Sequence, residues 1–165
     1  MDLVIRNEGP SDALAVYAVH QAAFGREAEA DLVDAVRDAR AAVLSLVGVF
    51  DDRVVGHVLF TPVSVGNTHA VGLGPLAVDP GVQGQGVGTA LVREGLLRLS
   101  TLGHVAVVVL GSPGYYQRFG FRPASAYGVS WDRPVPDEVF MALELRPNGL
   151  ADGGVARYLP LFDGV

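Results

Sequence analysis

One segment of the chain constrains its fold more than any other, because it is typical of a strand, a tight glycine-rich turn and a helix. From residue 73 to residue 92 it runs LGPLAVDPGVQGQGVGTALV. Glycines let a ligand approach the main chain closely, since a Cβ would block a phosphate there. The first turn of a helix adds unpaired N–H groups and a partial positive charge. The segment therefore predicts a diphosphate site at a helix N-terminus.

Two other interpretations of these glycines stay open. A dinucleotide-binding fold needs G-x-G-x-x-G/A and an acidic residue about twenty positions later. Here Thr89 stands at the third position of the motif, and Val108, with no acid beside it, stands near the acidic one. Nicotinamide or flavin binding is therefore disfavoured. Alternatively, the glycines only allow tight packing of a helix on a sheet.

Composition excludes several other classes of protein. The 165 residues carry a net charge of −6, no cysteine and 12 basic residues, all of them arginine. Without lysine the chain cannot be a P-loop ATPase or a Schiff-base enzyme. Without cysteine it has no disulfide or thiolate site. An acidic chain with no basic run is not expected to bind nucleic acid, and no HExxH-like spacing predicts a metal site.

Length and hydropathy predict a small cytoplasmic protein with no membrane partner. No apolar stretch is long enough to span a bilayer, and residues 1–6 do not form a secretory signal. A length near 150 favours one domain, which we place at residues 1–146. The tail, residues 147–165, contains Tyr158, Leu159, Leu161 and Phe162 near its end. We expect it to pack on the same domain.

Hydrophobic periodicity predicts an α+β protein of order βααβββαβαββ. Ser11 is the predicted N-cap of the first helix, and the segment 62–65 is expected to lead through a turn into the next strand. Strands are predicted near residues 3–6, 43–50, 54–60, 71–78, 105–110, 127–131 and 139–145, and helices beginning near residues 10, 28, 87 and 114.

Two motifs give the chain its resemblance to a known family. The letters QGQGVG at residues 83–88 match in full the Gln/Arg-x-x-Gly-x-Gly/Ala motif with which GNAT-superfamily N-acetyltransferases bind acetyl-CoA. After the next predicted strand, YQRFGF at residues 116–121 matches that family's Tyr-x-x-x-Gly-Phe. Over residues 3–146 the chain resembles a GNAT N-acetyltransferase, and its tail resembles the YhbS-like branch more loosely. The resemblance implies a mixed, mostly antiparallel central sheet flanked by helices.

The resemblance also implies that acetyl-CoA donates its acetyl group to a primary amine by direct attack. Backbone N–H groups of residues 83–89 would hold the pyrophosphate, and those near Leu76 and Val78 would meet the thioester oxygen. Tyr116 would be the general acid for the departing thiolate. Ser112, where many relatives have a nearby Asn, could supply a hydroxyl to pantetheine. The implied cofactor-binding residues are Leu76, Ala77, Val78, Gln83, Gly84, Gln85, Gly86, Val87, Gly88, Thr89, Ser112 and Tyr116.

The general base is the least determined part of the predicted site. Glu29 is the candidate base, with Glu27, because both lie near the helix pair that walls the acceptor site in the family. The alternative, which the sequence favours, is that these two carboxylates only form a solvated helix face. His57 lies in the middle of a predicted strand, where alternation alone does not decide which face of the sheet it takes. His57 or a chain of water molecules could accept the proton instead. With Asp31, the two glutamates favour a cationic acceptor.

The acceptor itself, a small-molecule or peptide amine, cannot be read from the sequence. The alternative function is a non-catalytic acyl-CoA-binding or sensing module on the same fold. Such a module could lose Tyr116 and keep the glycine loop, whereas this chain keeps both. Many members of the family are dimers, and an edge strand near the carboxyl end could pair two subunits into a homodimer.

Overall fold

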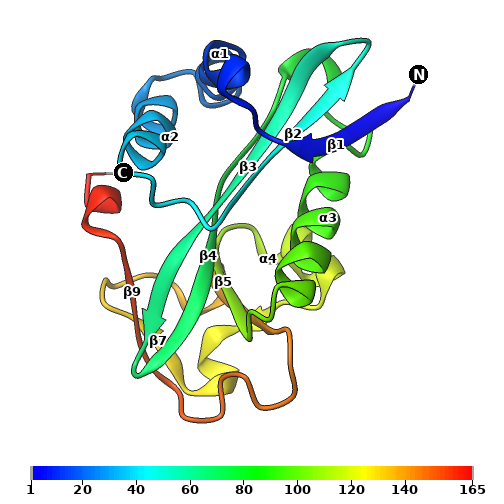
Figure 1. Ribbon diagram of the computed structural model, residues 1–165. Coiled ribbons are helices and arrows are strands. Elements are labelled where there is room, and N and C mark those ends of the chain that lie inside the picture. The colour runs from blue at the N-terminus through cyan, green and yellow to red at the C-terminus, as the bar shows by residue number, and fades with distance from the viewer. Residues whose placement is uncertain (1, 165) are drawn as a thin grey trace. The chain divides into compact units, whose positions relative to one another are not determined.

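The computed structural model describes residues 2–164, and its segments group into two units. The first unit comprises residues 1–60, 75–97 and 160–165, and the second comprises residues 61–74 and 98–159. Three elements run through both units, namely β3 (Arg53–Val65), β4 (Thr68–Val78) and α3 (Val87–Thr101) (Figure 1). No helix within residues 2–164 is long and apolar enough to cross a bilayer.

Three antiparallel strands form the sheet of the first unit. Strand β2 (Leu44–Phe50) pairs with β1 (Leu3–Asn7) on one side and with residues 53–60 of β3 on the other. Between β2 and β3, Asp51 and Asp52 have φ of 48° and 63°. A two-residue hairpin turn of this type requires positive φ at both positions, so the predicted hairpin is confirmed.

Two helices, α1 (Ala13–Phe24) and α2 (Ala28–Asp38), follow β1. The prediction of Ser11 as N-cap is wrong, because Ser11 lies inside a short 3₁₀ helix that precedes α1. Asp12 organises this entry instead, since its carboxylate accepts the Gly9 N–H at 2.7 Å and pairs with Arg6 at 2.7 Å. Both helices pack on the sheet through a shared apolar cluster of Val16, Leu32, Val33, Val36, Val47 and Leu59.

Helix α3 packs on the opposite face of this sheet (Figure 1). Glycines make the close approach possible: a Cβ on Gly56 of β3 would lie 2.8 Å from Val87 and 2.9 Å from Leu91. On the helix, a Cβ on Gly95 would lie 2.4 Å from the ring of Phe60. At these glycines, side chains of one element therefore pack directly against the backbone of the other.

The strands of the second unit are hydrogen-bonded in the order β3-β4-β5-β8-β6. Strand β5 (Ala106–Leu110) lies parallel to β4 and antiparallel to β8 (Phe140–Glu144). The short β6 (Arg122–Pro123) pairs with β8, while β9 (Gly154–Tyr158) pairs with both β3 and β7 (Val129–Trp131). The helix α4 (Pro113–Tyr116) follows β5.

The predicted fold class is confirmed, because the structure is a mixed, mostly antiparallel sheet with flanking helices. Two predictions of detail are wrong. Residues 62–65 do not form a separate segment but continue β3, and the order omitted β6 and β9. Strand β6 has only two residues, too few to show alternation. Strand β9 has five residues, but it begins directly after a turn containing Gly153, and the small Ala156 is its only buried side chain, so its sequence gives no apolar pattern.

Replacing Gly95 with Ala is expected to destabilise the protein even though Ala is the better helix former. The new Cβ would collide with the fully buried ring of Phe60. Overpacking costs about 1–3 kcal/mol, against a gain of roughly 1 kcal/mol in helix propensity. Urea unfolding should therefore give Gly95→Ala a lower free energy of unfolding. The control is Gly114→Ala, whose Cβ would meet nothing within 4 Å; equal stability of the two variants would contradict this packing.

Candidate active site

The glycine-rich loop before α3 exposes its main chain. Gly84 and Gly86 have φ of +78° and +88°, and a Cβ on either would meet nothing within 4 Å. Neither glycine is therefore needed for packing of the helix on the sheet. Residues 83–86 are exposed, and the left-handed conformation turns the chain into the first turn of α3, whose N–H groups have no partner within the helix. The loop has the geometry of an anion site.

Side chains at the end of β4 hold this loop in place. The Gln83 side-chain amide donates to the Val78 carbonyl at 2.9 Å. Asp79 accepts the Gly81 N–H at 2.8 Å through its side chain, and its own N–H donates to the Val55 carbonyl of β3 at 2.8 Å. The Gln83 side chain is thus engaged by the protein, which leaves the main chain of the loop to meet a ligand.

Strand β4 extends beyond its ladder with β5. The last parallel pair joins Leu73 to Val109, whereas β4 runs on to Val78. Gly74, at φ +142°, and Pro75 follow directly after the last residue of β4 that pairs with β5. Beyond them Ala77 is buried, and its neighbours Leu76 and Val78 are half-buried.

Tyr116 lies in the second unit, buried at the end of α4 with 8% of its surface exposed. Its ring contacts those of Tyr115 and Phe121 at centroid distances of 5.1 and 5.7 Å. Gly111 allows this position, since a Cβ there would lie 2.5 Å from the ring. Burial raises the pKa of Tyr116 well above its usual range, so the hydroxyl stays protonated and can act as a donor at neutral pH.

Ser112 begins the turn that carries Tyr116. Its carbonyl accepts the Tyr116 N–H at 3.1 Å, while its side chain makes no capping hydrogen bond. The structure thus places Ser112 with Tyr116 in the second unit, and the glycine loop with Leu76, Ala77 and Val78 in the first.

Glu29 does not lie on a solvated helix face. Its side chain is buried and pairs with Arg26 at 2.5 Å. Hydrogen bonds from Arg26 lower the pKa of the Glu29 carboxyl, which makes it a weaker proton acceptor than an ordinary glutamate. Glu27 is exposed, as expected of a solvated helix face, and Asp31 accepts the Tyr17 hydroxyl at 2.8 Å.

A chain of polar side chains that the sequence did not reveal lies between α1 and the sheet of the first unit. His20 Nε2 lies 2.7 Å from His57 Nδ1, and His57 Nε2 lies 2.7 Å from Ser45 Oγ. The Ser45 hydroxyl donates to the Glu8 carboxylate at 2.6 Å. Both histidines are fully buried. The sequence did not decide which face of the sheet His57 takes, and it gave no signal for the other three members.

The negative charge on Glu8 determines which group donates and which accepts in each hydrogen bond of this chain of side chains. Burial alone would raise its pKa, but hydrogen bonds from Ser45 and Arg37, together with the nearby His57, lower the pKa of Glu8 to about 2. Because an ionised carboxylate only accepts, Ser45 donates to Glu8 and in turn accepts from His57 Nε2–H. A neutral His57 then accepts at Nδ1 from His20 Nε2–H. The lone pair of His20 Nδ1 stays buried without a hydrogen-bond partner among residues 2–164.

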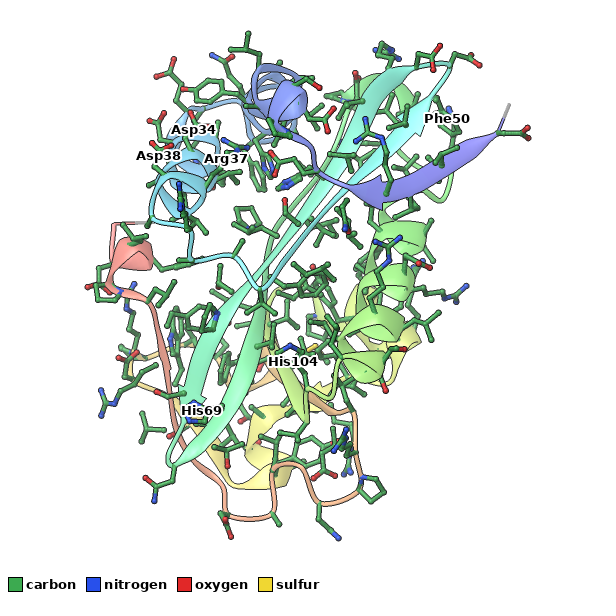
Figure 2. The ribbon with its side chains drawn as sticks, viewed as in Figure 1. Asp34, Arg37, Asp38, Phe50, His69 and His104 are labelled. Carbon is green, nitrogen blue, oxygen red and sulfur yellow. The ribbon has the colours of Figure 1, made fainter. Side chains whose placement is uncertain are left out.

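The two remaining histidines belong to the second unit. His69 is exposed near the end of the β3–β4 hairpin, and His104 precedes β5 (Figure 2). Within residues 2–164 no group of three or more His, Asp or Glu side chains is arranged to hold a metal ion.

Lowering the pH from about 6.5 should destabilise the protein through its buried histidines. Burial lowers the pKa of His20 to about 3 and lowers the pKa of His57. Below their ordinary value of 6.5, the unfolded histidines bind protons that the folded ones do not. The free energy of unfolding should fall by up to about 1.4 kcal/mol per pH unit for each histidine. Glu8 adds a further loss between its ordinary value of 4.5 and about 2.

Urea unfolding between about pH 7.5 and pH 5 measures the slope of the free energy of unfolding against pH. The variant His20→Gln, whose side-chain amide can donate a hydrogen bond in place of the imidazole N–H but cannot titrate, should show a shallower slope than the wild type. His69→Gln removes an exposed histidine and is the control, with a slope close to that of the wild type. Equal slopes for His20→Gln and the wild type would contradict the neutral, buried state of His20.

Comparison with known proteins gives consistent matches over most of the chain. Residues 13–121 match the acetyltransferase (GNAT) family. The uncharacterized N-acetyltransferase YhbS of Escherichia coli (strain K12) is 38% identical over 151 residues, 90% of each protein. A crystal structure of E. coli YhbS with CoA has a TM-score of 0.94 and 37% identity, covering 98% of this chain and 92% of YhbS. A GNAT acetyltransferase of Brucella melitensis with acetyl-CoA has a TM-score of 0.84 and 37% identity, covering 98% and 99%.

Proposed function

The chain belongs to the GNAT acetyltransferase family, and from this premise we propose that it transfers the acetyl group of acetyl-CoA to a primary amine by direct attack. The observation that carries the proposal is the glycine loop at the start of α3. Gly84 and Gly86 in this loop are left-handed and unobstructed, which supports a main-chain site for the cofactor phosphates. Two proteins of known structure that are each 37% identical to this chain were solved with a ligand of this kind, one with CoA and the other with acetyl-CoA.

Binding of the pyrophosphate is the role proposed for residues 83–89. Their main-chain N–H groups and the N-terminus of α3 would hold its negative charges. The Gln83–Val78 hydrogen bond supports this role, because it fixes the loop without using its main-chain donors. The residues proposed for this task are Gln83, Gly84, Gln85, Gly86, Val87, Gly88 and Thr89.

Acetyl transfer then needs a hydrogen-bond donor at the thioester oxygen and a proton donor at the sulfur. We propose that N–H groups near Leu76 and Val78, with Ala77 buried between them, polarise the carbonyl as the amine nitrogen attacks its carbon. The C–S bond breaks with its electron pair on sulfur, and the protonated hydroxyl of Tyr116 donates to the nascent thiolate. The hydroxyl of Ser112 is proposed to contact pantetheine.

The proton lost by the amine needs an acceptor. Glu29 stays the candidate base, with a chain of water molecules as the alternative. The ion pair with Arg26 favours the water chain, because it keeps the carboxylate ionised and weakly basic. The exposed Glu27 and the carboxylate of Asp31 support a cationic acceptor, and release of free CoA in the presence of an amine library would identify it.

Replacing Tyr116 with Phe should separate catalysis from binding. The ring and its packing are kept, so calorimetry should give an unchanged Kd for CoA, whereas kcat should fall about 100-fold or more if the hydroxyl donates to sulfur. Tyr115→Phe, one residue away, is the control and should keep its activity. If neither variant changes turnover, Tyr116 is not the acid; if no amine supports turnover at all, the protein is a binding module.

Replacing Gly86 with Ala should weaken the binding of CoA by about tenfold or more, since a Cβ would both strain the left-handed backbone and block the phosphate. Gly25→Ala is a matched control, because Gly25 also has a positive φ, of +68°, and open space at its Cβ, but lies at the end of α1. Calorimetry should show wild-type affinity for Gly25→Ala. Equal Kd values for both variants would contradict the proposed phosphate site.

A further inference from the structure

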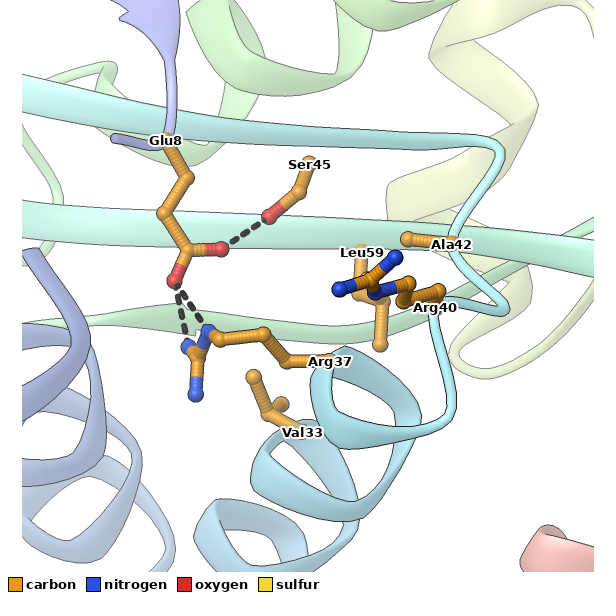
Figure 3. Close-up of a pocket in the computed structure, with 7 residues that line it drawn as sticks. All are labelled: Glu8, Val33, Arg37, Arg40, Ala42, Ser45 and Leu59. Carbon is orange, nitrogen blue, oxygen red and sulfur yellow. Dashed lines mark hydrogen bonds and ion pairs between the residues drawn. The ribbon is translucent and has the colours of Figure 1, made fainter. Parts of the chain in front are cut away.

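The pocket of about 290 Å³ in the first unit offers a ligand neither a free carboxylate nor an apolar wall (Figure 3). One oxygen of Glu8 accepts two hydrogen bonds from Arg37, and the other accepts the Ser45 hydroxyl. Two of its apolar lining residues, Val33 and Leu59, are buried in the core cluster. A hydroxyl group placed to serve the proposed transfer lies instead in the second unit.

Tyr158 lies near the end of the tail, in strand β9, outside the residues proposed for acetyl transfer. Strand β9 pairs with β3, where Tyr158 stands directly opposite Val63. Directly opposite residues of an antiparallel pair face the same side of a sheet, so these two side chains share one face. Both reach β4, since a Cβ on Gly72 would lie 2.7 Å from the Val63 side chain and 2.8 Å from Cε2 of Tyr158.

The side chain of Tyr158 crosses β3 and ends over β4. Strand β3 lies between β9 and β4 in the hydrogen-bonded order. The Tyr158 atom closest to the Cβ position of Gly72 is Cε2, at 2.8 Å, whereas Cδ2 lies at 3.4 Å. Because Cε2 is bonded to the carbon that carries the hydroxyl, the outer half of the ring lies on β4, and the hydroxyl is directed across β4 toward β5.

Gly72 lies close to the end of the ladder between β4 and β5. The ladder ends one residue later, at the pair of Leu73 and Val109. A Cβ on Gly74 would meet nothing within 4 Å, so the strand is open just beyond this point. Tyr158 therefore lies at the boundary between the packed part of this sheet and the opening where the two strands stop pairing.

Tyr116 reaches the same end of the sheet from β5. That strand ends at Leu110, and the Tyr116 ring lies against the following Gly111, whose Cβ would be 2.5 Å from it. Burial raises the pKa of Tyr158 well above its usual range, and an electrostatic effect of Tyr116 adds to this rise. Such an effect falls off with distance, in agreement with two hydroxyls that face one region. Tyr158 stays protonated at neutral pH, so it can donate and accept hydrogen bonds but is no base.

These positions suit a division of work between the two tyrosines. We infer that Tyr158 contacts the acceptor, its hydroxyl oxygen accepting an N–H hydrogen bond from the attacking amine and so orienting the nitrogen lone pair toward the acetyl carbon. The inference rests on the proposed transfer, in which Tyr116 serves the sulfur. No bond to Tyr158 forms or breaks, because its contribution is the alignment of the reacting atoms. The tail would then have a function, which is to bring this hydroxyl to the site.

Fluorine NMR tests the position of Tyr158 with acetyl-CoA alone. The five tyrosines are replaced by 3-fluorotyrosine, and Tyr→Phe variants assign their signals. Saturating acetyl-CoA should shift the signals of Tyr116 and Tyr158, and the Tyr158 signal should differ between the CoA and acetyl-CoA complexes. Tyr127, which packs on the same apolar cluster as Tyr158, is the control and should keep its shift.

The two tyrosine signals distinguish the failure of this inference from the failure of the proposed function. A shift of the Tyr116 signal without a shift of the Tyr158 signal would overturn the role of Tyr158 and leave the proposed transfer intact. Unchanged signals of both tyrosines would overturn the proposed function together with this inference.

Replacing Tyr158 with Phe separates substrate positioning from packing. The ring on Gly72 is kept, so the melting temperature should stay close to that of the wild type. With a primary amine selected by the library assay, kcat/KM for the amine should fall about tenfold through a higher KM, as expected for one lost hydrogen bond. The KM for acetyl-CoA should not change, and Tyr127→Phe should match the wild type in all these measurements. Wild-type kinetics for Tyr158→Phe, or a lower melting temperature as its only effect, would overturn the inference.

Discussion

The close approach of α3 to strands β2 and β3 is the constraint on which the first unit depends. Gly48, Gly56 and Gly95 bring helix and strands to a distance at which any Cβ would press on a neighbouring side chain. The N-terminus of α3 is thereby fixed beside the end of β4, where Asp79 and Gln83 tie the loop to the strands. A main-chain anion site needs this rigidity, because its donors must converge before the ligand arrives.

The conformation of the glycine loop could be predicted from the sequence, because the role proposed for the loop belongs to its main chain. A position that needs a positive φ or an unobstructed approach leaves glycine in the sequence, as at Gly84 and Gly86. The strands β2, β3 and β5 could also be predicted from the sequence, since the pattern of apolar residues marks the buried faces of a strand. Strand β6 could not be predicted, because its two residues are too few to show an apolar pattern.

The polar chain of His20, His57, Ser45 and Glu8 could not be predicted for the opposite reason. Its members come from α1, β3, β2 and the segment after β1, so no local spacing unites them. Alternation could not decide whether His57 faced α1 or α3. The ion pair that buries Glu29 was missed in the same way, because a carboxylate among polar helix residues gives no sign that an arginine three positions earlier will cover it.

The pKa shifts at these sites have one consequence for the chemistry. Tyr116 stays protonated because burial raises its pKa, and Glu29 stays ionised because Arg26 lowers its pKa. His57 stays neutral, since burial lowers its pKa. None of these three groups changes its charge near neutral pH. A rise in acetyl transfer with pH in that range would thus reflect deprotonation of the acceptor amine itself, with the protein supplying orientation and hydrogen bonds rather than a titrating base.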